Sequence, residues 1–189
     1  MPKLWNKTIE SHRQSVHDAT LNAVAKLAGK HGLLGLTMSH IAETAGIGRA
    51  TLYKYYPDIK SILAAWHERQ VARHLGELRD LARQDRRPDA RLAAILETYA
   101  QIAADTRAHG ELAAFLHRDG KVAGAQAELR AIIRAVIEDG VQSKLFRDDV
   151  GTAELAAYCL HAVAAAGNFK TKPAQRQLVA VILAGLAAE

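Results

Sequence analysis

The sequence predicts an all-α protein in two parts, an N-terminal three-helix domain followed by a six-helix bundle, with about nine helices in total. Three observations lead to this prediction. The 189 residues contain four prolines, and none interrupts a long periodic stretch. No run of useful length alternates apolar and polar residues as a half-buried strand does. Along most of the chain, apolar residues instead recur every three or four positions, which is typical of amphipathic helices.

The first helix is expected to run from Ser11 to Gly32. Ser11 followed by Gln14 is a capping-box pattern, in which two side chains satisfy free backbone amides at a helix start. A glycine is a common helix stop. The residues expected to face the core are Val16, Ala19, Ala23 and Leu27.

Two short helices then follow, residues 38–45 and residues 49–55, joined by a turn. Gly46 stands where a helix ends in a left-handed residue, a conformation that a Cβ makes costly. Ile41 and Ala42 lie on one face of the first short helix, and Leu52 returns to the core from the second. The pair has the pattern of a helix-turn-helix.

The remaining residues predict six further helices. Pro57 and Asp58 break the chain and cap a long helix that continues to the charged segment 85–88. We therefore place the domain boundary between residues 57 and 58, giving domains 1–57 and 58–189. The later helices are expected after Pro88, at 111–117, around 129–137, at 152–167 and from Pro173 onward.

The second short helix predicts DNA binding. Its expected outward face is basic, aromatic and small, a composition suited to a major groove. The residues on or near this face are Arg49, Ala50, Thr51, Tyr53, Lys54 and Tyr55.

The run IAETAGIGRATLYKYYPDIKSIL, residues 41–63, resembles the DNA-binding signature of the TetR/AcrR family of bacterial regulators. Two positions depart from that pattern. Gly48 stands where the family usually has Ser or Thr, which weakens the N-cap of the second short helix. Ile59 stands where many members have a Lys, and whether Lys60 takes over that phosphate contact is left open.

Individual roles follow from residue chemistry. Arg49 is placed either to read a guanine edge with two hydrogen bonds or to contact a phosphate. Ala50 and Thr51 can touch a thymine methyl or approach the backbone. Thr37 can cap the first short helix and offer its hydroxyl to a phosphate. Phosphate contacts are expected from Tyr53, Tyr55 and Lys54, with a base-edge contact as the alternative for Lys54. The resemblance implies the same phosphate role for Tyr53 and Tyr55.

The distribution of charge supports this prediction. Residues 1–60 hold eight Lys/Arg and four Asp/Glu, a net charge of +4, whereas residues 61–189 hold seventeen and sixteen, a net of +1. The excess lies in the third of the chain that carries the helix-turn-helix, where counterion release favours a polyanion.

The last two helices indicate a homodimer. One is dominated by small residues, and the other, QLVAVILAGLAA (177–188), is apolar on nearly every side. Such a helix must be covered all round, either inside the monomer or by a second copy in a four-helix bundle. The resemblance implies the second arrangement.

The C-terminal part is expected to bind a small-molecule effector, as the resemblance implies. Six large or polar side chains could line its site, although each is also compatible with an ordinary core position: Trp66, Tyr99, Phe115, His117, Tyr158 and His161. The effector's identity does not follow from the sequence.

Other classes of function find no support in the sequence. No histidines lie four apart on a helix, and no Cys or carboxylate cluster completes a site, so we predict no metal site. No Gly-rich phosphate loop follows a strand and no nucleophile elbow is present, so we predict no catalytic group and no cofactor. Neither a signal peptide nor a membrane span is predicted, and the single cysteine, Cys159, suggests a reducing compartment, the cytoplasm. The predicted function is therefore a homodimeric repressor that an inducer releases from a palindromic operator. A non-specific architectural DNA binder is the alternative, and a helical enzyme or carrier is a more distant one.

Overall fold

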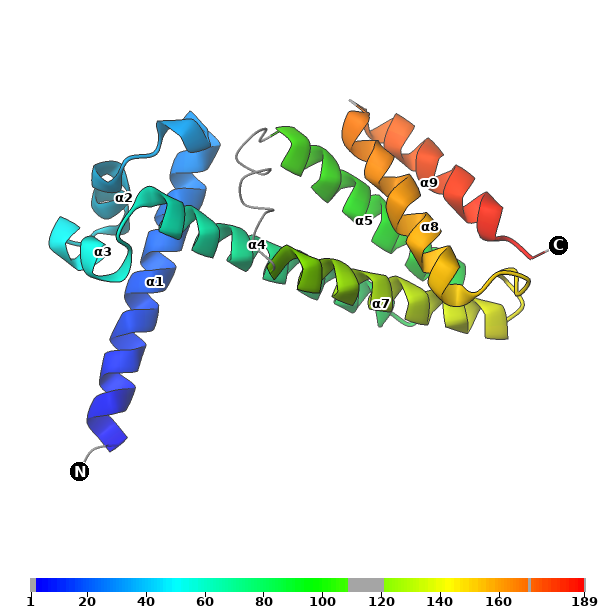
Figure 1. The fold of residues 1–189 in the computed structure, drawn as a ribbon, viewed down its shortest axis with the longest axis horizontal. Helices are drawn as coiled ribbons and strands as arrows, with labels where there is room; N and C mark the ends of the chain where they lie inside the picture. The colour runs from blue at the N-terminus through cyan, green and yellow to red at the C-terminus, as the bar shows by residue number, and fades with distance from the viewer. Residues whose placement is uncertain (1–2, 109–120, 170, 189) are drawn as a thin grey trace. The chain divides into compact units, whose positions relative to one another are not determined.

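The computed structural model describes residues 3–108, 121–169 and 171–188, which form eight α-helices and two short 3-10 helices (Figure 1). Within these ranges the one β-type pairing outside the helices is an isolated antiparallel bridge between Phe146 and Ala187. The predicted all-α fold is confirmed. The helix expected at residues 111–117 lies outside the described residues. No described helix is both long and apolar enough to cross a membrane.

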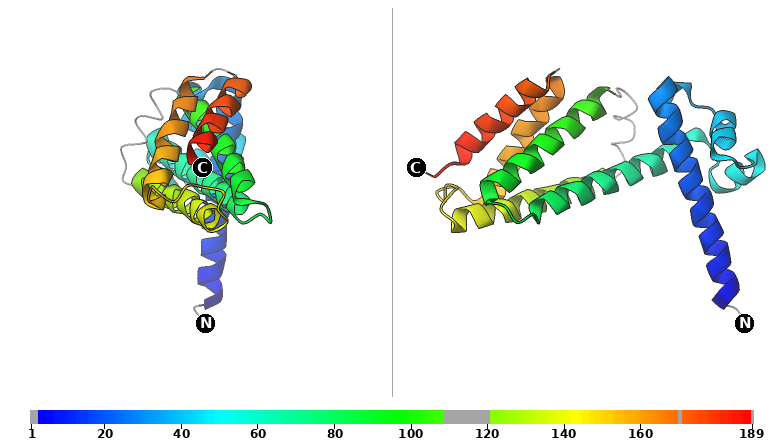
Figure 2. Two further views of the ribbon diagram at one scale, coloured as in Figure 1. Left: turned by 90° about the vertical axis from the view of Figure 1, so that its right-hand side faces the viewer. Right: turned by 180° about the vertical axis from the view of Figure 1, so that it is seen from behind.

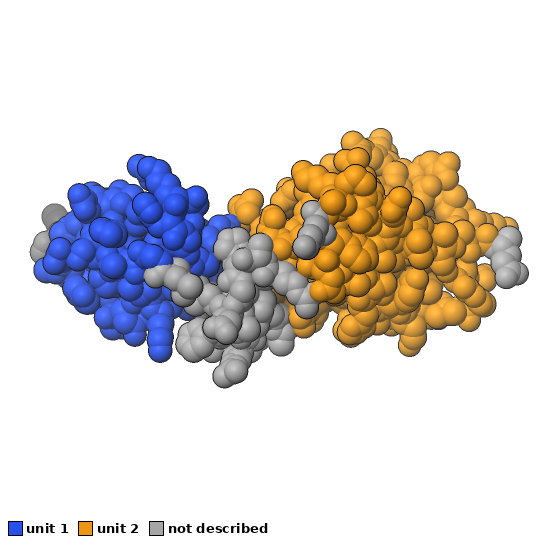
Figure 3. Space-filling view, turned by 90° about the horizontal axis from the view of Figure 1, so that it is seen from above, with its two compact units in different colours: residues 1–70 blue, residues 71–189 orange. Residues whose placement is uncertain are grey.

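The chain divides into two compact units, Met1–Gln70 and Val71–Glu189 (Figure 3). The division falls within one continuous helix, α4 (Ile59–Ala82), so each unit contains about half of it. The domain boundary that the sequence predicts between residues 57 and 58 stays a prediction.

The first unit is organised around α1 (Lys3–His31). A short 3-10 helix, η1 (Leu33–Gly35), leads to α2 (Met38–Ala45) and α3 (Arg49–Tyr55), and both of these helices contact α1. The bounds predicted for the two short helices agree with the structure. The buried side chains that α1 contributes to this core are Val16, Thr20, Leu21, Ala23, Val24 and Leu27.

The predicted start of α1 is wrong. The helix begins at Lys3, and Ser11 lies in its interior. The side chain of Gln14 does not return to Ser11 as a capping box requires; its amide donates to Asp18 at 3.2 Å, one turn ahead. Figure 2 shows the resulting N-terminal half of α1, which extends beyond α2 and α3.

The second unit is a bundle in which α5 (Pro88–Ala108) contacts three other helices. These are α7 (Lys121–Gln142), α8 (Thr152–Ala164) and α9 (Lys172–Leu186), and a short 3-10 helix, η2 (Ala165–Asn168), follows α8. Its largest fully buried side chains are Leu78, Leu92, Ile95, Leu96, Ile133, Ile137, Ile182 and Leu186.

The loop between α7 and α8 closes one end of this bundle. Phe146 is buried against Gly140 of α7, where an added Cβ would overlap the aromatic ring. The Arg147 amide donates to the carbonyl of Leu186 at 2.9 Å, and the Ala188 amide donates to the carbonyl of Leu145 at 3.2 Å. These two bonds hold the end of the chain against the loop.

Arg91 joins three helices of the second unit. Its guanidinium donates to the carbonyl of Ala82, at the end of α4, at 3.0 Å and to the Asp139 carboxylate of α7 at 2.9 Å. The Arg91 side chain is only 15% exposed, so this pair is better shielded from solvent than a surface pair. Arg79 of α4 forms a further ion pair with Glu128 of α7. The second half of α4 is therefore anchored to this bundle.

Candidate DNA-binding interface

The turn between α2 and α3 is built around Gly46. This residue adopts φ 68° and ψ 29°, the left-handed conformation. The Gly46 amide donates to the carbonyl of Glu43 at 3.1 Å, and the Ile47 amide donates to the carbonyl of Ala42 at 3.0 Å. These bonds satisfy carbonyls that would otherwise lack partners at the end of α2, and they fix the direction in which the chain leaves the helix.

The start of α2 is equally well defined. Thr37 is its N-cap, and the Thr37 hydroxyl accepts a hydrogen bond from the His40 amide at 3.2 Å. The cap expected at Thr37 is therefore present. The α3 helix has no such bond, because its N-cap residue is Gly48.

Burial separates α3 into an inner and an outer side. Leu52 is 0% exposed and rests in the core with Ile41 and Ala42 of α2, which are 0% and 2% exposed. Of the six α3 residues expected at the DNA, four are exposed and two are partly buried. The exposed ones are Arg49, Ala50, Tyr53 and Lys54, and the partly buried ones are Thr51 and Tyr55.

Tyr56 connects the end of α3 to α1. Its hydroxyl lies 2.5 Å from Nδ1 of His17, and the two rings stack with centroids 6.1 Å apart. Burial raises the pKa of Tyr56 above its ordinary value of 10.0, so the hydroxyl stays protonated at neutral pH. Tyr56 is 7% exposed, so its side chain is part of the core of the first unit.

The first half of α4 supports the same unit. The Asp58 carboxylate accepts a hydrogen bond from the Ser61 amide at 2.8 Å, which caps the helix. Ile62 and Leu63 are buried, and Arg69 donates to the Asn22 side chain of α1 at 3.0 Å. Sequence reasoning missed Asn22, Arg69 and His17, because no motif indicates which residues of α1 face α3 and α4.

The structure gives positions for all eight residues predicted to contact DNA. Thr37 is exposed at the start of α2, six residues lie on α3, and Lys60 is exposed in the first turn of α4. All eight belong to the first compact unit. Their roles at DNA stay predictions.

The six residues predicted to line an effector site are distributed differently. Trp66 belongs to the first unit and is partly buried, and its indole Nε1 is buried with no hydrogen-bond partner among the described residues. Tyr99 packs partly buried against the core of the second unit, and burial raises its pKa above 10.0. Tyr158 is 44% exposed on α8, where His161 is also exposed. Phe115 and His117 lie outside the described residues.

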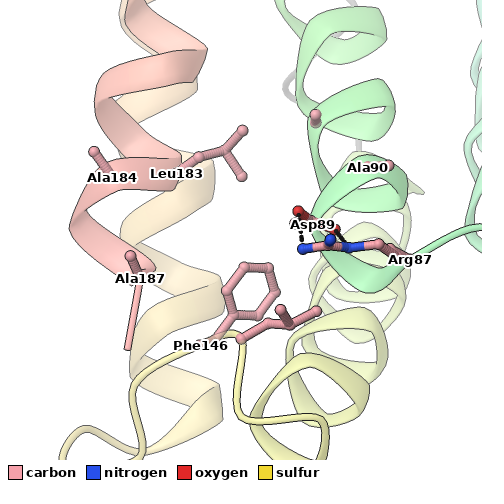
Figure 4. Close-up of a pocket in the computed structure, with 9 residues that line it drawn as sticks. Arg87, Asp89, Ala90, Phe146, Leu183, Ala184 and Ala187 are labelled. Atoms are coloured by element: carbon pink, nitrogen blue, oxygen red, sulfur yellow. Dashed lines mark hydrogen bonds and ion pairs between the residues drawn. The ribbon is translucent and has the colours of Figure 1, made fainter. Parts of the chain in front are cut away.

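A surface pocket of about 470 Å³ lies between α5 and α9 and contains none of those six residues (Figure 4). Phe146 and Leu183 contribute apolar side chains, and Arg87 pairs with the Asp89 carboxylate at 3.0 Å beside them. The Arg87 side chain is 69% exposed, so this ion pair is largely solvated. The pocket therefore lacks a buried polar group that could orient a ligand.

The α9 helix has two distinct faces. Val179, Ile182 and Leu186 are buried in the bundle. The opposite face is exposed and mostly apolar, and Val181 is 65% exposed. The exposed residues on this face are Gln177, Ala180, Val181, Ala184 and Gly185. The exposed Tyr158 of α8 lies beside it, because a Cβ on Gly185 would be 3.2 Å from the Tyr158 hydroxyl.

Comparisons with known proteins identify the first unit and the fold. Residues 18–66 match the family model described as bacterial regulatory proteins, tetR family. No curated protein matches the sequence at a significant level.

Solved structures are similar over most of the chain. A TetR/AcrR-family regulator from Thermobifida fusca has a TM-score of 0.72 at 16% identity, covering 89% of this chain and 97% of that one. The ketosteroid regulator KstR2 of Mycobacterium tuberculosis has a TM-score of 0.62 at 16% identity, covering 92% and 95%. FadR from Bacillus subtilis, solved with stearoyl-CoA, has a TM-score of 0.61 at 13% identity, covering 92% and 99%.

Proposed function

On the premise that this chain has the fold of the TetR/AcrR transcriptional regulators and carries a tetR-family DNA-binding domain, we propose that it is a homodimeric, sequence-specific repressor. It binds a palindromic operator and is released by a small-molecule inducer. The observation that carries this proposal is the outer side of α3, which presents Arg49, Tyr53 and Lys54 from a helix anchored by the buried Leu52.

Sequence is read by the first turn of α3. Arg49 and Ala50 are exposed there, and the well-defined turn at Gly46 fixes the angle at which they approach a groove. A bidentate contact from Arg49 to a guanine contributes about 1–3 kcal/mol of discrimination between bases.

Phosphate contacts fix the position of α3 in the groove. They come from the Thr37 hydroxyl and the α2 amides, from the hydroxyls of Tyr53 and Tyr55, and from the cations Lys54 and Lys60. Such contacts carry no sequence information and add salt-dependent affinity, because each one releases condensed counterions. The net charge of +4 over residues 1–60 supports this arrangement.

The exposed face of α9, together with Tyr158 of α8, forms the homodimer interface. Small residues at Ala180, Ala184 and Gly185 permit close approach of a second helix, and Val181 and Tyr158 supply apolar area. Two α9 helices and two α8 helices then make a four-helix bundle. The dimer presents its α3 helices to two half-sites about 34–36 Å apart or somewhat more.

An effector bound in the C-terminal unit shifts the protein toward a form that does not bind DNA. The FadR structure shows that this fold accommodates a ligand as large as stearoyl-CoA in that protein. In the second unit of this chain, Tyr99 is the predicted lining residue that is partly buried against the core. A coupling of about 1–3 kcal/mol would change operator affinity by about 5- to 150-fold.

The proposal is tested by selecting bound fragments from a random duplex library with ligand-free protein in the salt concentration of the cytoplasm, where we expect this regulator to act. Recovery of a palindrome supports it. DNA retained without enrichment of any sequence would favour the non-specific architectural binder. Absence of any retained DNA would refute DNA binding altogether.

Substitutions then test the recognition face. Arg49→Ala should relax base preference at one position of each half-site, whereas Lys54→Ala and Tyr55→Phe should weaken binding to all sequences alike. Lys26→Ala removes an exposed cation from α1 outside the helix-turn-helix and serves as the control for lost charge. If the three test variants bind as the control does, α3 is not the recognition helix.

A further inference from the structure

The α3 helix depends on few contacts for its order. It is seven residues long, and among those seven Leu52 alone is buried. Its N-cap residue is Gly48, which has no side chain to accept a hydrogen bond from the helix. An isolated helix of this length does not persist in water, so the attachments at its ends decide how well α3 is ordered.

The C-terminal end of α3 has a polar attachment to α1. Tyr56 is the C-cap, and its amide donates to the carbonyl of Leu52 at 2.9 Å. Its hydroxyl lies 2.5 Å from Nδ1 of His17, and the planes of the two rings are 26° apart. A phenylalanine would fill the same space without a partner, whereas the hydroxyl of a buried tyrosine costs free energy unless it is hydrogen-bonded. The His17 ring supplies the partner that Tyr56 needs.

The direction of this hydrogen bond depends on the charge of the imidazole. Burial keeps the Tyr56 hydroxyl protonated at neutral pH by raising its pKa, so the hydroxyl donates and Nδ1 of His17 accepts. An imidazole accepts at Nδ1 only when it is neutral and carries its hydrogen on Nε2. A protonated imidazole has hydrogens on both nitrogens and accepts at neither. The bond is therefore lost in this direction when His17 takes up a proton.

The charged groups around the bond come from α1, α2 and α4. Besides burial, the Arg69 guanidinium of α4 lowers the pKa of Tyr56 and the Asp18 carboxylate of α1 raises it. On α2, which also contacts α1, the titratable groups are His40 and Glu43, and both are exposed. All of these charges are retained in the variants that test the bond.

We propose that His17 is a positioning residue for DNA binding, which holds the end of α3 through the Tyr56 hydroxyl and releases it on protonation. DNA binds the ordered form of α3, so the bond raises the fraction of molecules that are ready to bind. Affinity for DNA attributable to this pair should then fall as the pH falls. This inference rests on the proposed function, because it requires that α3 be the recognition helix.

The pH dependence of operator affinity tests the proposal. His17→Asn keeps an acceptor oxygen, Oδ1, at the place of Nδ1 and does not take up a proton. Wild type and this variant are compared on a duplex recovered from the selection, at constant ionic strength, between about pH 5 and pH 8, where histidines change charge. The two should bind alike at the upper end. At the lower end wild type should bind about 2- to 12-fold more weakly than the variant, the factor that corresponds to one hydrogen bond.

Two controls separate the bond from other effects of charge. In a Tyr56→Phe background, which keeps the buried ring, His17→Asn should no longer alter the pH profile, because no hydroxyl remains to donate. His31→Asn removes an exposed histidine from the end of α1. Protonation of such a histidine can only add a charge that favours DNA, so wild type should not bind more weakly than this variant in acid. Circular dichroism melting at both ends of the pH range verifies that each variant is folded.

The outcomes separate this inference from the proposed function. A wild-type protein that binds no duplex at any pH would refute the proposed function, and the role of His17 with it. A wild type that binds its operator with the same pH profile as His17→Asn would refute the role of His17 alone. A difference in profile that persists in the Tyr56→Phe background would also refute it, because His17 would then act through its charge and not through Tyr56.

Discussion

Substitution of Gly46 by Ala should destabilise the protein through backbone conformation alone. Gly46 has φ 68°, and no heavy atom lies within 4 Å of the position that its Cβ would occupy. The new methyl group therefore meets no neighbour. What it changes is the energy of the left-handed conformation, which costs an L-residue about 1–2 kcal/mol relative to glycine.

That cost can be converted to a melting temperature. For a chain of this size, 1 kcal/mol corresponds to a shift of about 2–4 °C, so Gly46→Ala should lower the midpoint by about 2–8 °C. The assay is thermal unfolding followed by circular dichroism at 222 nm, the usual helix signal. Gly46→Asn should lose less, because Asn enters the left-handed region more readily than Ala.

Replacement of Gly76 by Ala should raise the stability of the protein, whereas Gly46→Ala lowers it. Gly76 lies inside α4, where an added Cβ also has no heavy atom within 4 Å. Ala is the better helix former there, so Gly76→Ala should stabilise by about 0.5–1 kcal/mol. If Gly46→Ala melted at or above the wild-type temperature while Gly76→Ala behaved as expected, the left-handed cap would not be what ends α2.

Two further predictions concern the second unit. Val181→Glu places a charge on the exposed apolar face of α9 and should convert the dimer to a monomer in analytical ultracentrifugation. The control is Arg176→Glu, which changes an exposed residue outside the apolar part of that face and should leave the dimer intact. Burial raises the pKa of the Cys159 thiol to about 12, so the native protein should not react with an aromatic disulfide reagent at pH 8 and should react once unfolded. Between about pH 9 and pH 12 the thiol ionises in the unfolded chain but stays protonated in the native protein, because its native pKa is raised from 9.0. The free energy of unfolding should therefore fall as pH rises through this range, and Cys159→Ala should abolish that fall. Rapid labelling of the native dimer would contradict the burial of Cys159.

Where strong local signals occur, the sequence was sufficient to predict structure. The bounds of α2 and α3 follow from Thr37, which caps one helix, from Gly46, which ends it, and from the break at Pro57. The TetR/AcrR resemblance stated on residues 41–63 is confirmed by the family match over residues 18–66 and by the fold. Each of these signals is local, because it depends on the conformational preference of one or two residues.

Where several local patterns compete, the sequence was insufficient. Ser11 and Gln14 offer a helix start, yet the preceding Lys, Leu and Glu residues are good helix formers and continue α1 to Lys3. Leu21 and Val24 were missing from the predicted core, although both are 0% exposed. The faces of α8 could not be assigned, because a helix rich in alanine has little amphipathic contrast. For that reason Tyr158 was considered for a ligand site, and the structure describes it as 44% exposed.

The shared helix α4 constrains how regulators of this kind can be recombined. A fragment that ends at residue 57 would lack Ile62 and Leu63, which are 0% and 5% exposed in the first unit. A chimaera joined at Gln70 would keep them, but its junction lies inside a continuous helix. Each residue gained or lost there turns the following segment by about 100° and shifts it by about 1.5 Å. Exchange of effector units between such proteins therefore has to preserve helical phase, and insertions of seven residues, close to two full turns, should be tolerated better than insertions of one or two.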